Sequence, residues 1–141
     1  MTPTPHRVTG QTKDAGFQIG VSRTLRLPPD HLWRFLTSPR GLALWLGKGA
    51  RVEPTRGAGY TTADGATGEV RGYHEGTRIR VTHRVPGAAS ATTRQVTVTP
   101  VANGAVLRFH EERLTDAAHR ACRREHWQGV LAEVVRALGA E

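Results

Sequence analysis

The C-terminal stretch at residues 115–138 constrains the fold more than any other part of this 141-residue chain. Its second half repeats apolar residues at intervals of three and four, which predicts an amphipathic helix packed on a core. These residues are Trp127, Val130, Leu131, Val134, Val135 and Leu138. In the first half the same face turns polar and carries His119, Cys122, Arg123 and His126. A helix that closes a core with one half and presents polar groups with the other is typical of the lid of a cavity.

The segments before this helix alternate apolar and polar residues in short runs, which predicts antiparallel strands joined by turns. Asp64-Gly65 and Asn103-Gly104 are hairpin signals. The predicted strands are residues 17–27, 51–54, 57–62, 67–73, 77–85, 92–101 and 105–112.

Two short helices are predicted after the first strand. Pro28-Pro29-Asp30 ends that strand and places a proline and an acid in the first helical turn. Ser38 is the expected cap of the second helix, with Pro39 at its first position and Gly47 after its end. The chain therefore predicts an α+β domain whose curved antiparallel sheet wraps around the C-terminal helix. That helix is the only element long enough to cover the apolar face of the sheet.

Several local signatures recur in a fixed order. They are Ser22-Arg23, residues 28–33, residues 36–39 with Trp45, residues 68–70 with Arg78-Ile79, residues 95–100 with Gly104, and Trp127. In this order they resemble the START/Bet v 1-like (SRPBCC) superfamily, and within it the branch named after the activator of Hsp90 ATPase homologue, which is common among bacterial proteins. The resemblance covers roughly residues 17–138. It implies a helix-grip fold with about seven strands and two short helices after the first strand.

The chain departs from this branch at three positions. His126 stands where a glycine usually precedes the tryptophan, His83 where an aromatic residue is common, and Glu111 where a histidine is common. All three positions fall on the elements expected to surround the cavity.

Residues 1–16 are rich in Pro, Thr and Gly and predict a flexible arm ahead of a single domain at residues 17–138. The arm lacks the apolar core of a secretory signal, and no apolar run approaches the ~20 residues of a membrane span. The single cysteine, Cys122, excludes an internal disulfide and fits a reducing compartment. We therefore expect a cytoplasmic protein with no membrane contact.

The formal net charge is +8, and only two lysines contribute to it. Such a charge is typical of proteins that bind polyanions. The arginines are scattered, however, and no basic run is longer than Arg123-Arg124. An ordinary solvated surface explains this pattern as well, so the sequence does not favour a nucleic-acid partner. A long edge strand would permit a homodimer.

The alternation of the predicted strands points one set of residues toward the C-terminal helix. This apolar lining with a few converging polar groups is typical of a small-molecule site, and Trp45 and Tyr73 are expected to shape its mouth. The predicted ligand-binding residues are Trp45, Tyr73, Val81, His83, Val96, Phe109, Glu111, His119, Cys122, Arg123, His126 and Trp127.

A buried carboxylate at Glu111 needs a partner, because desolvation would otherwise neutralise it. The candidates are Arg94, Arg123, His83 and His126. Two interpretations stay open. These groups either orient a ligand or transfer its protons, or they form a structural ion pair at the cavity rim.

His119, Cys122 and His126 are three and four residues apart, so with Glu111 or His83 they could supply a zinc site. The pattern lacks the paired signatures of zinc modules, and no metal or cofactor is predicted. No oxyanion arrangement accompanies Cys122, so we expect a small buried side chain rather than a nucleophile.

Three functions follow from this sequence. The first is a binding module that holds a small hydrophobic or amphipathic molecule between the sheet and the C-terminal helix. The second is an enzyme of the cyclase/aromatase or hydrolase type that uses acids and bases of the pocket. The third is a protein-interaction or co-chaperone-like module. Because one fold hosts many functions, the family name alone does not choose among them.

Overall fold

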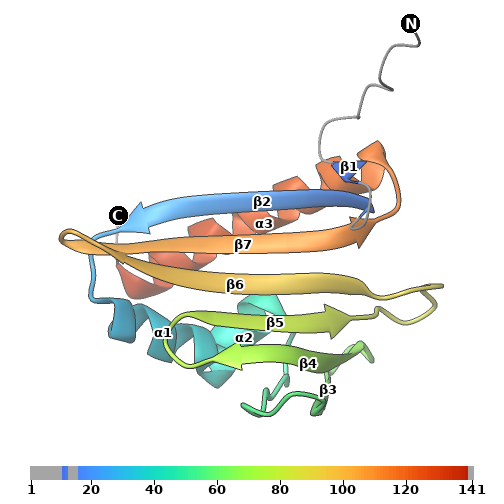
Figure 1. The fold of residues 1–141 in the computed structure, drawn as a ribbon, viewed down its shortest axis with the longest axis horizontal. Coiled ribbons are helices and arrows are strands. Elements are labelled where there is room, and N and C mark those ends of the chain that lie inside the picture. Colours follow the sequence, from blue (N-terminus) through green and yellow to red (C-terminus); the bar gives the residue numbers. More distant parts are fainter. Residues whose placement is uncertain (1–10, 13–15, 140–141) are drawn as a thin grey trace, which may run out of the picture.

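The structure is a computed structural model that describes residues 11–12 and 16–139 (Figure 1). Its elements in chain order are β1 (Gln11–Thr12), β2 (Gly16–Leu25), α1 (Pro29–Thr37), α2 (Pro39–Trp45), β3 (Gly59–Thr61), β4 (Thr67–His74), β5 (Arg78–His83), β6 (Thr92–Val101), β7 (Gly104–Leu114) and α3 (Ala117–Leu138). Most of the predicted arm at residues 1–16 lies outside the described residues. Of that arm, Gln11 and Thr12 pair with the start of β2.

The seven described strands form one antiparallel sheet in the order β1-β2-β7-β6-β5-β4-β3. The first long strand therefore pairs with the last one. Helix α3 packs on β2 and β7, and α1 packs on β6 and β7 (Figure 1). The predicted helix-grip architecture, with two short helices after the first long strand and a long C-terminal helix on the sheet, is confirmed.

One predicted strand is wrong. Residues 51–54 form no strand, although Val52 is partly buried against the core. The backbone of Val70 in β4 bonds to Gly57 and Ala58, which lead into β3. Pro54 has no N–H group to donate to a ladder, which disfavours a strand at residues 51–54.

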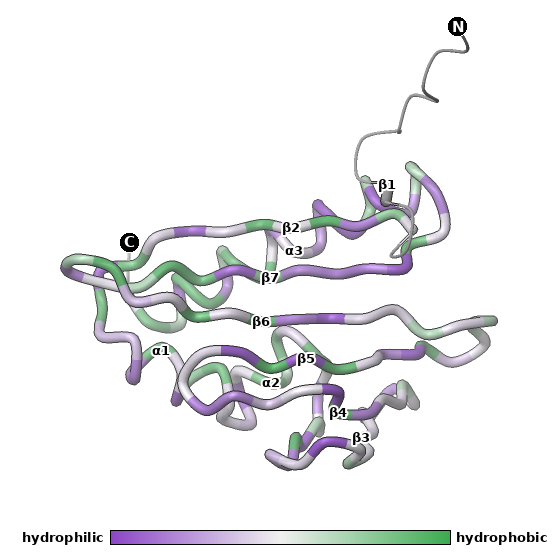
Figure 2. Tube along the Cα trace, viewed as in Figure 1, coloured by the Kyte–Doolittle hydropathy of each residue, from purple (hydrophilic) through white to green (hydrophobic). Residues whose placement is uncertain are grey.

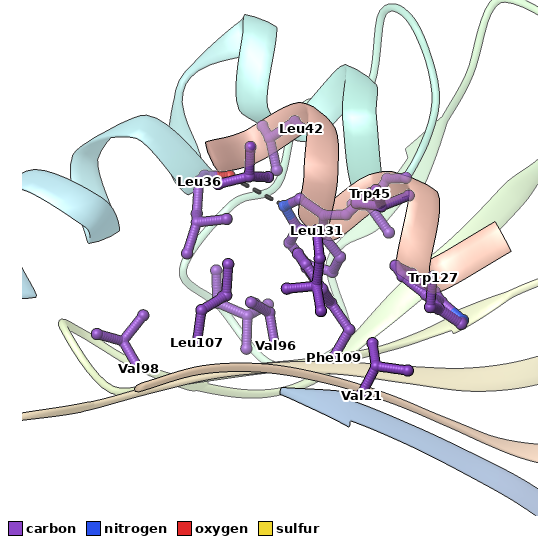
Figure 3. Packing of buried hydrophobic residues seen from close by; sticks show 14 of the residues in the cluster. Val21, Leu36, Leu42, Trp45, Val96, Val98, Leu107, Phe109, Trp127 and Leu131 are labelled. Atoms are coloured by element: carbon purple, nitrogen blue, oxygen red, sulfur yellow. Dashed lines mark hydrogen bonds between the residues drawn. The ribbon is translucent and has the colours of Figure 1, made fainter. Parts of the chain in front are cut away.

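A close junction between α1 and α2 positions the second helix on the core. The Ser38 hydroxyl accepts a hydrogen bond from the Gly41 N–H at 3.1 Å, which confirms the predicted cap. A Cβ atom at Gly41 would lie 1.8 Å from the carbonyl oxygen of Phe35, so only glycine fits there. The junction directs Trp45 inward, where its indole N–H donates to the carbonyl oxygen of Leu36 at 3.0 Å (Figure 3).

The core lies between the sheet and the three helices. Figure 2 shows the alternating hydropathy along the strands, and Figure 3 shows the inner residues packed against Leu36, Trp45 and Leu131. The predicted inward set is buried throughout: Ile79, Val81, His83, Val96, Val98, Leu107, Phe109 and Glu111. Burial of each large apolar side chain contributes about 1.5–3 kcal/mol to stability.

Helix α3 begins where Asp116 caps it, its carboxylate accepting the His119 N–H at 2.7 Å. It ends at Gly139, whose φ of 62° places it in the left-handed region that suits glycine. Its second half is buried as predicted, except that Leu138 stays partly exposed. No helix within the described residues is long and apolar enough to cross a membrane.

Candidate functional site

A cavity of about 280 Å³ lies at the end of the sheet where β5 and β7 finish and β6 begins (right side of Figure 1). The first turns of α3 and the loop between β5 and β6 complete its wall. The residues that line it are His83, Val85, Ala88, Ala89, Ser90, Thr92, Arg94, Glu111, Arg113, Thr115, His119 and Arg123. The loop side of this wall is largely apolar, and the sheet and helix side is polar.

Glu111 is the centre of the polar wall and is only 1% exposed. One carboxylate oxygen, Oε1, accepts from Arg123 Nε at 2.6 Å and from the Trp127 indole at 2.9 Å. The other oxygen, Oε2, accepts from the Thr92 hydroxyl at 2.6 Å. Arg94 Nε lies 3.5 Å from Oε2 as an ion pair. The carboxylate of Glu111 is thus held by residues of β6 and α3 at once.

These contacts decide the charge of Glu111. Burial opposes ionisation, but the two arginine charges and the hydrogen bonds from Thr92 and Arg123 outweigh it. The pKa of Glu111 falls from 4.5 to about 2. The side chain is therefore a carboxylate at neutral pH.

The two arginines enclose the indole ring of Trp127. The guanidinium carbons of Arg94 and Arg123 lie 5.3 and 5.6 Å from the ring centroid, within the range of a cation–π contact. Arg94 also donates to the carbonyl oxygen of Trp45 at 2.9 Å. Trp127 in turn stacks on Phe109 with centroids 5.0 Å apart, so the charged cluster is anchored directly to the core (Figure 3).

Several donors of this cluster have no acceptor among the described residues. Arg94 Nε and Arg123 Nη2 are buried and make no hydrogen bond. Arg123 Nη1 makes none either, and it is not among the buried atoms. Buried polar groups without partners are rare in folded proteins, and they mark places where a missing molecule is expected.

His83 lies on the same wall and is neutral. The Tyr60 hydroxyl donates to the carbonyl oxygen of Thr82 at 2.7 Å, so its single proton is used. The 2.8 Å contact between this hydroxyl and His83 Nδ1 therefore requires Nδ1 to carry the proton. Burial, with a smaller contribution from the Arg94 charge, lowers the pKa of His83 from 6.5 to about 4. The remaining nitrogen, Nε2, is an acceptor.

The predicted ligand-binding residues divide into three groups. His83, Glu111, His119 and Arg123 line the cavity. The second group is buried in the core beneath or beside it: Trp45, Val81, Val96, Phe109 and Trp127. The third group lies elsewhere. Tyr73 packs edge-on against Trp33, His126 packs edge-on against Trp127 with its surface exposed, and Cys122 is exposed. The expectation that Cys122 would be buried is wrong.

Sequence reasoning missed four polar residues of the cavity: Ser90, Thr92, Arg113 and Thr115. Thr92 pairs with His83 across β5 and β6, a register that the alternation of the two strands could have suggested. Arg113 has a φ of 65°, which turns the end of β7, and no local signal marks it. Among the described residues no group of three His, Cys, Asp or Glu side chains is placed to hold a metal ion.

Comparison with known proteins agrees with this architecture. The family model described as "Activator of Hsp90 ATPase homolog 1-like protein" matches residues 26–139. The chain belongs to this family. No functionally curated protein matches it.

Three similar solved structures illustrate the range of the fold. DynU16, from the dynemicin biosynthetic locus, is 20% identical with a TM-score of 0.72; the match covers 86% of this chain but only 47% of DynU16. CV1439 of Chromobacterium violaceum is 27% identical, with a TM-score of 0.65 and coverage of 83% and 94%. The Aha1 dimer of Colwellia psychrerythraea is 16% identical, with a TM-score of 0.68 and coverage of 83% and 92%.

Proposed function

We propose that this family member is a binding module for a small hydrophobic or amphipathic molecule, held in the cavity between the sheet and the first half of α3. The observation that carries the proposal is the composition of the cavity wall. Val85, Ala88 and Ala89 supply apolar surface, and Arg123 lies in the same wall with a terminal amino group, Nη1, that is not buried and has no hydrogen bond among the described residues. An apolar pocket with a few fixed polar groups is how proteins bind small molecules.

The cavity volume supports a ligand of modest size. About 280 Å³ lies at the lower end of the ~300–1,000 Å³ typical of small-molecule pockets. DynU16 comes from a biosynthetic locus, which is consistent with a small-molecule ligand in this fold. The Colwellia relative is a dimer, and a homodimer of this chain is a further proposal that light scattering would test.

The charges of the site favour binding over acid–base catalysis. An effective general base has a pKa near the working pH. The pKa of Glu111 is about 2 and that of His83 is about 4, so neither group takes up a proton readily at pH 7. Both are held by neighbouring side chains, which suits positioning rather than proton transfer.

Native mass spectrometry of the protein purified from its own organism tests the proposal, together with thermal-shift measurements on a library of small organic acids, alcohols and aromatic compounds. We expect either a co-purified small molecule or compounds that raise the melting temperature, because binding to the folded state stabilises it. The Ala88→Trp variant fills the cavity and should lose this binding.

The matched control is Ala132→Trp, which adds the same side chain at an exposed position of α3. It should bind like the wild type. Equal binding by the wild type and Ala88→Trp, or an empty wild-type protein that no compound stabilises, would show that the cavity is not a ligand site.

A further inference from the structure

The cavity wall carries more positive than negative charge. Arg94, Arg113 and Arg123 line it together with a single carboxylate, Glu111. These four groups together carry a net charge of +2. A charge buried beside an apolar surface requires compensation. Among the described residues of this wall, Glu111 supplies one negative charge for three arginines, of which Arg94 is buried, Arg123 is partly buried and Arg113 is exposed.

Glu111 has little capacity left for this purpose. Both of its oxygens already accept hydrogen bonds, Oε1 from Arg123 and Trp127 and Oε2 from Thr92. Its role is to fix the guanidinium of Arg123 through Nε and to neutralise one of the arginines. The terminal amino groups of Arg123, Nη1 and Nη2, remain without an acceptor.

The guanidinium of Arg123 is held before any ligand arrives. Glu111 binds Nε at 2.6 Å, and the Trp127 ring lies 5.6 Å from the guanidinium carbon. Fixing a binding group in advance lowers the entropy lost on association. The planar fork of an arginine matches the two oxygens of a carboxylate better than any other side chain.

Arg113 provides a second, independent observation. Its φ of 65° is unfavourable for a residue with a side chain and costs on the order of 1 kcal/mol. Arg113 lines the cavity and is exposed, and none of the ion pairs among the described residues includes it. Backbone strain of this kind is concentrated at functional sites, where the surrounding structure maintains it.

His119 adds a hydrogen-bond donor to the same region. Its Nδ1 accepts the N–H of Thr115 at 3.1 Å, so in the uncharged ring Nε2 carries the proton. This nitrogen has no partner among the described residues.

From this arrangement, and resting on the proposed function, we infer that the ligand is an amphipathic organic anion. Its carboxylate, or an enolate or phenolate oxygen of similar charge, binds Arg123 and Arg113. Its apolar body lies against Val85, Ala88 and Ala89.

Isothermal titration calorimetry at low ionic strength tests the inference with three pairs of compounds of matched shape. The pairs are benzoate and benzamide, cinnamate and cinnamamide, and 2-naphthoate and 2-naphthamide. For at least one pair the wild-type protein should bind the acid at least tenfold more tightly than the amide. The preference should weaken as salt is added, since salt screens the arginine charges.

Two variants test whether Arg123 and Arg113 bind the anionic group of the ligand. Arg123→Gln and Arg113→Gly should each reduce the preference for the acid by about fivefold or more and leave the affinity for the amide unchanged, which is the effect of one charge in a partly buried site. Arg113→Gly removes the backbone strain with the charge, so its melting temperature should be the same or higher. A loss of acid binding in this variant therefore does not result from unfolding. Arg124→Gln, at the neighbouring exposed position of α3, is the control and should keep the preference.

The outcomes separate the two proposals. Equal affinity for acid and amide in every pair that binds would overturn the anionic ligand and leave the binding module in place. A preference that survives in both arginine variants would also overturn it. Failure of all six compounds to bind would overturn this inference, whereas the binding module is decided by the native mass spectrometry and thermal-shift measurements above.

Discussion

Replacing Glu111 with glutamine tests whether the buried carboxylate organises this end of the domain. The amide has the shape of the carboxylate and resembles its protonated form. It keeps an oxygen for Trp127 and Arg123, but it presents an NH₂ group to Arg94 or Thr92 and leaves the two arginines without a counter-charge. Removing one partner from a buried ion pair costs about 3–5 kcal/mol.

The shift in the pKa of Glu111 gives a second, independent value for the free energy by which the carboxylate stabilises the fold. It falls from 4.5 to about 2 in the folded state, and each unit corresponds to about 1.4 kcal/mol. The ionised carboxylate therefore stabilises the fold by about 3 kcal/mol at neutral pH. Because the folded-state pKa is depressed, this contribution is complete above pH 4.5 and is lost as the pH falls toward 2. By pH 3.5 the wild type should have lost about 1 kcal/mol from this group, and by pH 2 about 3 kcal/mol.

Urea unfolding at a series of pH values measures both effects. At pH 7 the free energy of unfolding of Glu111→Gln should be about 3 kcal/mol below that of the wild type. The gap should narrow on acidification, since the variant has no carboxylate at this position to protonate. The control is Glu133→Gln, which breaks the exposed pair with Arg136 and should cost less than about 1 kcal/mol.

Two results would refute this reasoning. A loss of less than about 1 kcal/mol at pH 7 would mean that Glu111 is not the counter-charge of the two arginines. A gap that stays constant from pH 7 to pH 3 would mean that the loss comes from the shape of the amide rather than from its missing charge.

Three further predictions concern other parts of the molecule. Gly41→Ala should lower the free energy of unfolding by about 2 kcal/mol or more, because its Cβ would overlap a carbonyl oxygen of α1; Gly129→Ala, in open space on α3, should raise it by about 1 kcal/mol in the same urea titration. His83 should show the Nδ1–H tautomer and no protonation above about pH 5 in nitrogen NMR spectra, because its pKa is about 4, and the Tyr60→Phe variant should disturb this tautomer. Cys122 should react completely with a thiol reagent in the native protein, because it is exposed; slow reaction that requires unfolding would contradict the structure.

The sheet was predictable because its strands obey a local rule. Residues two apart face the same side of a strand, so the alternation at Ile79, Val81 and His83 places the histidine on the inner face without knowledge of any partner. The same rule placed Glu111 inside. Residues 51–54 were mispredicted because a short run of residues does not show whether a neighbouring strand can pair with it, and Pro54 lacks the N–H group that a ladder needs.

The part of the site on α3 was harder to predict, because the prediction placed too many residues of the helix on the side that faces the cavity. Each residue advances about 100° around an α-helix, so Cys122 lies that far from Arg123 and His126 that far from Trp127. Arg123 and Trp127 are four residues apart and define the face that meets Glu111. Residues three and four positions from His119 include both Cys122 and Arg123, so spacing alone does not show which of them faces the sheet. Only the position of the sheet decides this.

The two interpretations of Glu111, a structural ion pair and a ligand contact, apply to different atoms of one cluster. The carboxylate bonds to Nε of Arg123 and to the Trp127 indole, and these contacts stabilise the fold. They also fix the direction of the guanidinium, whose terminal amino groups then have no acceptor among the described residues. An ion pair that served only the fold would satisfy the buried Nη2 as well, since an unpaired buried donor costs about 1–3 kcal/mol. Under the proposed binding function the cluster combines both roles, with Glu111 as the positioning residue and Arg123 as the group that meets the ligand.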